Sequence, residues 1–251
     1  MIWDELTSPM IDSLDRDIPV LLPIAATEQH GPHLPLATDR LIGWHFAHSL
    51  HLKIPEQVLI LPPVAVGCSN HHMDFPGTLT VSHEAFATYV EEVLESVLAH
   101  DFNNLIILNS HGGNQGIGQV ILERLGPEVN QLVLVTWWKL ASEALAKISE
   151  TGPGGIGHAC EFETSLMLHI APHLVNNNLI EPGDNQKTFG WAEADMLRGA
   201  KASLYRTMYE MTPNGIFGDP TKASAKKGEQ ISSLVVQSLK YLVQDLLNNS
   251  E

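Results

Sequence analysis

Short runs of apolar and β-branched residues alternate along this chain with longer segments whose apolar residues recur at helical spacing. The strand-like runs cover 18–26, 57–66, 103–109 and 131–137, and the helical segments between them cover 38–52, 82–100 and 114–125. Strands separated by helices form parallel sheets, because a parallel pair needs a long crossover connection. The runs are apolar on both faces, as strands between two helical layers are. The sequence therefore predicts a three-layer α/β/α fold with a mostly parallel sheet.

The remainder of the chain predicts a glycine-rich loop, two more helices and an irregular segment. Five residues of 151–157 are Gly or Pro, which predicts a tightly turning loop. A helix is expected over 158–170 and another over 222–248, whereas 183–221 shows little periodicity. A length of 251 residues without internal repeats predicts one domain spanning 1–251.

The charge balance excludes several classes of partner. Lys and Arg number 14 against 29 Asp and Glu, so the formal net charge is -15 and phosphate backbones and anionic lipid are repelled. No apolar run approaches the roughly 20 residues of a membrane helix. Two cysteines, Cys68 and Cys160, are too few for a disulfide framework. We expect a cytoplasmic protein that binds neither nucleic acid nor membrane.

The first candidate site follows the first predicted strand, in the segment TEQHGPHLPLATDR. It contains Glu28, His30 and Asp39. Ligand sites of α/β sheets form at the carboxyl ends of strands. Glu28 and His30 are two residues apart, so they face the same side if the backbone is extended there. Carboxylates and imidazoles that face one point predict a metal site.

The third predicted strand ends in NSHGGN, which places His111 at the same edge of the sheet. Gly112 and Gly113 follow it. Glycines let the backbone approach a ligand closely, and their amide groups can meet a developing oxyanion. We therefore expect His111 in the metal site and both glycines beside the substrate.

Three further residues are expected near the substrate. His72 lies just before the segment MDFPGT and is a candidate for the pocket. Trp137 and Trp138, with the glycine-rich loop after them, are expected to close over a small planar substrate.

The segment GHACEFETS contributes the last candidates. On a helix, His158 and Glu161 share one face, whereas Glu163 turns nearly to the opposite side. We therefore expect Glu161 to join the metal site and Glu163 to support it from behind or cap the local backbone. His158 titrates near neutral pH and is the expected proton donor to the leaving nitrogen.

Other residues have simpler explanations. His45, His48 and His51 repeat at helical spacing, which is typical of a polar helix surface, and we expect none of them to be a ligand. Cys160 is expected to be a small buried thiol. Any single His or Glu near a strand end is usually a solvated loop residue. Three clusters of acids and imidazoles, each next to glycine, favour a functional site instead.

Five segments together resemble the creatininase (creatinine amidohydrolase) family: TEQHGPHLPLATD, HHMDFPGTLT, NSHGGN, GHACEFETS and GIFGDPTKASAKKGE. They occur in the family's order and span nearly the whole chain. The resemblance implies an α/β/α domain, a centre of two zinc or manganese ions and a homohexamer built as a trimer of dimers. It implies that Glu28 and His111 bind one ion, that His30 binds the other, and that Asp39 bridges both.

The sequence departs from creatininase itself at one implied ligand. Creatininase supplies a further glutamate from a motif of the form NGHYEN, and the matching position here is Gly113. Glu161 stands where creatininase has an apolar residue, so it is expected to restore the lost carboxylate. The loop 151–157 also lacks the tryptophan that creatininase carries before its matching histidine. This arrangement resembles that of relatives acting on formamides or peptides, which puts creatinine in doubt as the substrate.

These residues predict a dinuclear metal-dependent amidohydrolase. Two ions about 3.5–4 Å apart activate a shared hydroxide and polarise the attacked carbonyl. The expected substrate is a small amide, cyclic or open, such as creatinine, cleaved at a non-peptide C–N bond. The alternatives are a family hydrolase acting on a formamide or a peptide end, and a noncatalytic metal-binding subunit. His158 argues against the last, because a binding protein needs no proton donor.

Overall fold

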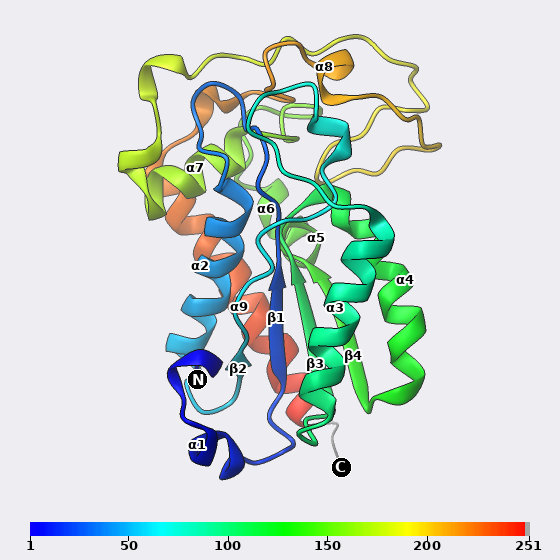
Figure 1. Cartoon of the computed structure of the whole chain (residues 1–251). Helices are drawn as coiled ribbons and strands as arrows, with labels where there is room; N and C mark the ends of the chain where they lie inside the picture. The colour runs from blue at the N-terminus through cyan, green and yellow to red at the C-terminus, as the bar shows by residue number, and fades with distance from the viewer. Residues whose placement is uncertain (249–251) are drawn as a thin grey trace.

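A four-stranded parallel sheet forms the centre of the computed structural model, which describes residues 1–248 (Figure 1). The strands lie in the order β2-β1-β3-β4, and every neighbouring pair is parallel. Their bounds are Val20–Ile24 for β1, Leu59–Ile60 for β2, Asn104–Asn109 for β3 and Gln131–Thr136 for β4. The predicted parallel α/β architecture is confirmed.

Helices cover both faces of the sheet. The helices α2, α7 and α9 pack on one face, and α3 and α4 on the other (Figure 1). Their bounds are Thr38–Lys53 for α2, His83–Leu98 for α3, Gln115–Leu125 for α4, Glu161–Ile170 for α7 and Ala225–Asn248 for α9. No helix among residues 1–248 is long and apolar enough to cross a membrane.

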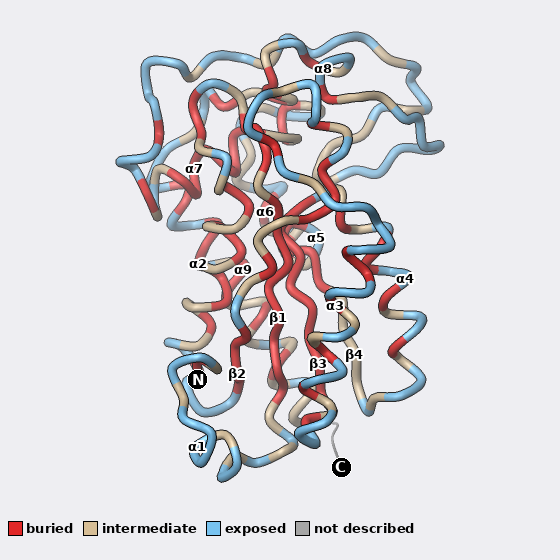
Figure 2. The backbone as a smooth tube through the Cα atoms, in the orientation of Figure 1, coloured by how far each residue is buried: buried red, intermediate tan, exposed pale blue. Residues whose placement is uncertain are grey.

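The two helical layers enclose two hydrophobic cores, one on each face of the sheet. Successive side chains of a strand point to opposite faces. Leu21 and Ile106 accordingly pack in the core under α2 and α9, and Leu22 and Ile107 pack in the core under α3 and α4. Strands β1, β2 and β3 are therefore buried on both sides (Figure 2), as their continuous apolar runs predict. The edge strand β4 is buried only at Val135 and Thr136 and is half-buried before them.

Short helices punctuate the connections. They are η1 Trp3–Glu5, α1 Ser8–Asp12, η2 Asn70–His72, η3 Gly112–Asn114, η4 Gly126–Glu128, α5 Trp137–Leu140, α6 Ser142–Ala146, η5 Pro172–Leu174, η6 Asn177–Leu179, α8 Met208–Met211 and η7 Pro220–Lys222. The long irregular segment and α8 lie at the end of the molecule toward which the strands point, and the N-terminus and the last turn of α9 lie at the opposite end (Figure 1).

Two elements differ from the sequence expectation. β2 is far shorter than 57–66, because Pro62 and Pro63 have no amide hydrogen to donate to the ladder. The helix expected from 158 begins only at Glu161. Before it, His158 exchanges two backbone hydrogen bonds with Phe217, at 2.7 and 2.9 Å, and Ala159 adopts a left-handed φ of 53°. This delayed start decides which acid of the segment faces the site.

Candidate metal centre

Seven acids and imidazoles converge at the carboxyl edge of the sheet. They form three overlapping groups, in each of which three possible ligand atoms lie within 4.8 Å of one another. The groups are Glu28 with Asp39 and His111, His30 with His158 and Glu163, and Glu28 with His72 and His158. The structure thus brings together four of the five predicted metal ligands, with His72, His158 and Glu163.

The members of the cluster lie in loops and in first helical turns at that edge. Glu28 and His30 lie in the loop after β1, and His111 lies two residues after the end of β3. Asp39 and Glu163 lie in the first turns of α2 and α7. The positive end of a helix dipole favours a carboxylate there. The parallel topology therefore gathers residues that are far apart in sequence.

Close contacts tie the imidazoles to the acids. His111 Nδ1 lies 3.3 Å from Glu28 Oε1 and 3.1 Å from Asp39 Oδ2, and His30 Nε2 lies 3.1 Å from Asp39 Oδ1. Burial disfavours a charged imidazole, but the carboxylates of Asp39 and its neighbours outweigh it and raise the pKa of His30 to about 9. The pKa of His111 is raised well above its usual value in the same way, chiefly by Glu28. The buried carboxylates therefore stabilise positive charge placed between them.

Two carboxylate oxygens of the cluster have no hydrogen-bond partner among residues 1–248. They are Glu28 Oε2 and Asp39 Oδ2; His111 Nδ1 lies near the second, but not in hydrogen-bonding geometry. A buried polar atom without a partner is costly. A cation between these oxygens would satisfy both, and a donor set of carboxylates and imidazoles suits zinc or manganese. The residues present therefore fit a divalent metal.

Glu163 faces this cluster. Its Oε1 lies 3.9 Å from His30 Nε2, and its Oε2 accepts a hydrogen bond from the backbone N–H of Ala159. Burial raises the pKa of Glu163 to about 7, opposed by His30 and reinforced by Asp39. Glu163 thus caps the local backbone through Oε2, and it also joins His30 and His158 as a possible metal ligand.

Glu161 lies outside the cluster, contrary to the sequence expectation. Its fully buried carboxylate accepts hydrogen bonds from the backbone N–H groups of Glu150 and Thr151, both at 3.0 Å, and pairs with the ammonium group of Lys227. The expectation assumed that His158 and Glu161 occupy one helix. Because the helix begins at Glu161, the spacing of residues on a helix does not apply between them.

The backbone at Gly113 is too crowded for a side chain. A Cβ atom there would lie 2.1 Å from the carbonyl oxygen of Cys68 and 2.4 Å from His111 Nε2. That Nε2 donates a hydrogen bond to the same carbonyl at 3.2 Å, which leaves Nδ1 facing the acids. The carboxylate that the resemblance places at position 113 therefore has no room here, whereas Glu163 approaches the cluster from α7.

We expect Gly113→Ala to lower metal affinity by at least about tenfold, because the added methyl group must displace His111 or the Cys68 carbonyl. Metal titration of the purified variant measures this. Gly116→Ala is the matched control, since a Cβ at that helical position meets nothing within 4 Å. Equal metal affinity in the two variants would show that His111 does not need this backbone position.

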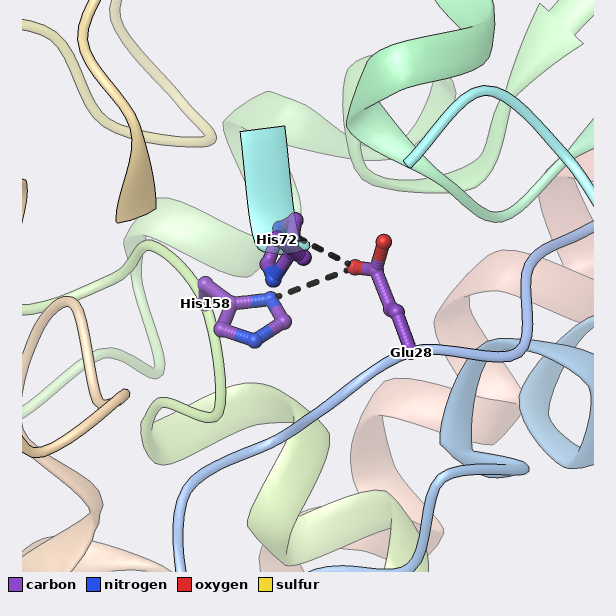
Figure 3. A group of neighbouring side chains, drawn as sticks. All are labelled: Glu28, His72 and His158. Atoms are coloured by element: carbon purple, nitrogen blue, oxygen red, sulfur yellow. Dashed lines mark ion pairs between the residues drawn. The ribbon is translucent and has the colours of Figure 1, made fainter. Parts of the chain in front are cut away.

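Gln29 orients two imidazoles of the cluster, a role that no sequence pattern indicated. Its Oε1 accepts from the N–H of Gly31 at 2.9 Å, so its Nε2 is the donor to His72 Nδ1 at 3.0 Å. His72 Nε2 then faces Glu28 Oε1 at 3.3 Å. His158 Nε2 donates to the Gln29 carbonyl at 2.7 Å, which leaves Nδ1 toward Glu28 Oε1 at 3.7 Å (Figure 3). The tautomers follow from these partners.

Both of these imidazoles are neutral near neutral pH. Burial, followed by the neighbouring imidazoles His30 and His72, holds the pKa of His158 well below its usual value. This differs from the sequence expectation that His158 titrates near neutral pH. Burial likewise lowers the pKa of His72 to about 3, although Glu28 opposes it. His158 therefore presents an unprotonated Nδ1 to the cluster and can accept a proton there.

A cavity of about 530 Å³ opens onto the cluster. Of the residues expected near the substrate, His72, Gly112 and Trp138 line it, whereas Gly113 and the fully buried Trp137 do not. The cavity wall also includes Phe217, from the segment GIFGDPTKASAKKGE. Further lining residues come from α5, α8 and the irregular segment and carried no sequence signal: Lys139, Asp195, Met196, Leu197, Arg198, Met208 and Met211.

The residues set aside in the sequence lie outside the three groups. Within residues 1–248, His45, His48 and His51 belong to none of them, and His45 Nε2 instead lies 2.7 Å from the hydroxyl of Ser232. Burial raises the pKa of the Cys160 thiol, which is fully enclosed. Neither feature adds a ligand to the centre.

Comparison with known proteins gives a consistent set of relatives. The family model described as Creatininase: Creatinine amidohydrolase matches residues 4–243. The mycofactocin precursor peptide peptidase of Mycobacterium ulcerans (strain Agy99) is 32% identical over 227 residues, which are 86% of this chain and 81% of the relative. The creatinine amidohydrolase of Pseudomonas putida is 26% identical over 179 residues, 64% of this chain and 67% of the relative.

Solved structures of the same fold also match. A mutant creatininase described as "Zn-Zn type" has a TM-score of 0.77 at 22% identity, and the match covers 97% of both chains. A structure described as "Creatininase Mn" has a TM-score of 0.76 at 22% identity, again over 97% of both chains. At this identity they show a common fold.

Proposed function

Since this chain belongs to the creatininase family of hydrolases, we propose that it cleaves an amide bond near the end of a short peptide, using two divalent metal ions. The observation that carries the choice of substrate is the size of the cavity, about 530 Å³. Cavities of roughly 300–1,000 Å³ hold drug-sized ligands, whereas a single small ring such as creatinine fills little of that space. The peptidase relative supports the same choice.

For the metal centre we propose Glu28, Asp39 and His111 around one ion, and His30 and Glu163, with Asp39 bridging, around the other. The unpartnered oxygens of Glu28 and Asp39 support this assignment. Zinc and manganese are the candidate metals, because both occur in creatininase structures. Bound there, the ions would supply Lewis acidity, which activates water and polarises a carbonyl.

We assign proton transfer to His158. Its Nδ1 carries no proton in the tautomer fixed by Gln29, and it faces the cluster beside Glu28. An imidazole in this state can take a proton from the attacking water and deliver it to the departing nitrogen, which leaves poorly unless protonated. The contacts around His158 thus support a base that becomes the acid within one catalytic cycle.

The remaining expectations from the sequence stay predictions. The family model spans residues 4–243, which supports one metallohydrolase domain over 1–251. A homohexamer is expected from the family resemblance, and light scattering of the purified protein checks it. The cytoplasmic location also stays a prediction.

Turnover of a defined panel tests the proposed function. We expect protein supplied with zinc or manganese to hydrolyse short peptides with kcat/KM at least about 100-fold above that for creatinine, because a small ring leaves most of the cavity unfilled. Chelation should remove the activity and added metal should restore it. Mass spectrometry of the products identifies the cleaved bond. Faster turnover of creatinine or of a formamide would overturn the peptide proposal and support the other small amides.

A further inference from the structure

Two cationic side chains line the cavity that the acidic cluster also lines. They are Lys139 and Arg198. Lys139 lies in α5, immediately after β4, and Arg198 lies in the irregular segment between α7 and α8. The fold thus brings two cations that are distant in sequence to the same cavity.

The carboxylate of Asp195 holds the segment that carries Arg198. Its Oδ1 accepts from the backbone N–H groups of Leu197 and Arg198 at 2.9 and 2.8 Å, and its Oδ2 accepts from the N–H of Gly154 at 3.0 Å. Arg198 Nε and Nη2 also donate to Oδ2, both at 3.2 Å. Both carboxylate oxygens of Asp195 therefore accept hydrogen bonds, and they fix the backbone and the guanidinium group of Arg198.

The cationic groups keep capacity for a ligand. The side chain of Arg198 is 60% exposed, and within residues 1–248 its Nη1 donates no hydrogen bond. Lys139 is exposed, and in the same part of the chain its ammonium group makes no ion pair or hydrogen bond. Asp195 offsets one of the two charges, so Lys139, Arg198 and Asp195 together keep a net positive charge.

We propose that Lys139 and Arg198 bind the C-terminal carboxylate of the peptide that this enzyme cleaves; the inference rests on the proposed function. A guanidinium fork and an ammonium group are the side chains that recognise carboxylates. A peptide's N-terminal ammonium group would be repelled by the same pair. Trp138, Met196 and Leu197 line the cavity beside them and offer apolar contact to the terminal side chain.

This assignment determines what the reaction releases. Water adds across the C–N bond, so the acyl carbon gains the hydroxyl group and the departing nitrogen gains the proton. The peptide is shortened and ends in a new carboxylate. The released C-terminal fragment carries a free amine together with the carboxylate that Lys139 and Arg198 held.

Matched peptides test the inference in the metal-loaded enzyme. The series has one sequence with a free C-terminal carboxylate, with a C-terminal amide, and with a free carboxylate and an acetylated N-terminus. We expect amidation to raise KM by about 10- to 100-fold, because it removes charge-assisted hydrogen bonds, and acetylation to change KM little. Lys139→Met should raise KM for the free acid by about tenfold and leave KM for the amide unchanged.

Variants at three positions complete the test. Arg198→Met should act as Lys139→Met does, and Arg198→Lys, which keeps the charge, should recover part of the loss. Lys147→Met, at an exposed lysine outside the cavity, is the control and should match the wild type. Equal KM for acid and amide in the wild type would overturn the carboxylate assignment while leaving a peptidase. Absence of cleavage of every peptide would overturn the proposed function itself.

Discussion

Glu163→Gln is expected to release one of the two proposed metal ions and to lower turnover by about 100-fold or more, whereas Glu161→Gln is expected to leave both bound. Glu163 Oε1 lies 3.9 Å from His30 Nε2, and the two residues share one group of possible ligand atoms with His158. A neutral amide offsets no ion charge. Loss of a residue that only supports a ligand typically costs about 10- to 100-fold in affinity or activity, so loss of a ligand should reach at least the upper end.

The number of metal ions bound per chain is measured in both variants after identical metal supplementation. Glu161→Gln is the matched control, because it makes the same chemical change two residues away in the same helical turn, at a carboxylate held by Lys227. Wild-type protein should approach two ions per chain. Two ions in Glu163→Gln would exclude Glu163 as a ligand, and selective loss of one ion in Glu161→Gln would return the ligand role to Glu161.

Lys227→Met is expected to reduce the free energy of unfolding by about 3–5 kcal/mol, the usual cost of removing one partner from a buried ion pair. Lys227 is 5% exposed, and its ammonium group contacts Glu150 Oε1 at 2.6 Å and the carbonyl of Lys222 at 2.8 Å, besides the fully buried Glu161. Without the lysine, the Glu161 carboxylate stays buried with no cation beside it.

Urea unfolding of the metal-free protein measures this loss. Lys226→Met, at the exposed neighbouring position on α9, is the control and should change stability by less than about 0.5 kcal/mol. The double variant Lys227→Met with Glu161→Leu should recover much of the loss, since no buried charge is left alone. If Lys227→Met and Lys226→Met unfold alike, the ion pair does not stabilise the fold.

The same pair connects stability to the site. Glu161 accepts hydrogen bonds from the backbone at Glu150 and Thr151, where the glycine-rich loop begins, and that loop leads directly to His158. Lys227→Met should therefore also lower kcat at temperatures where the protein remains folded. No sequence pattern indicates this link, because Lys227 lies 66 residues from its partner.

Local sequence patterns were sufficient for the architecture. Apolar runs buried on both faces predict interior parallel strands, and helical spacing predicts α2, α3, α4 and α9 to within a few residues, because both depend on neighbours along the chain. The short length of β2 could also be predicted from the sequence, because Pro62 and Pro63 lie within the apolar run. The cluster of Glu28, His30, Asp39 and His111 also follows from sequence, since parallel strands end at one edge.

The remaining features depend on contacts between distant segments. The choice between Glu161 and Glu163 turns on the bridge from His158 to Phe217, which delays the start of α7, and on the lysine of α9 that pairs with Glu161. The cavity wall with Lys139 and Arg198 comes from segments without periodicity. Sequence patterns report backbone preference and burial along one element, whereas the direction of a buried carboxylate is decided by whichever distant donor reaches it in the folded chain.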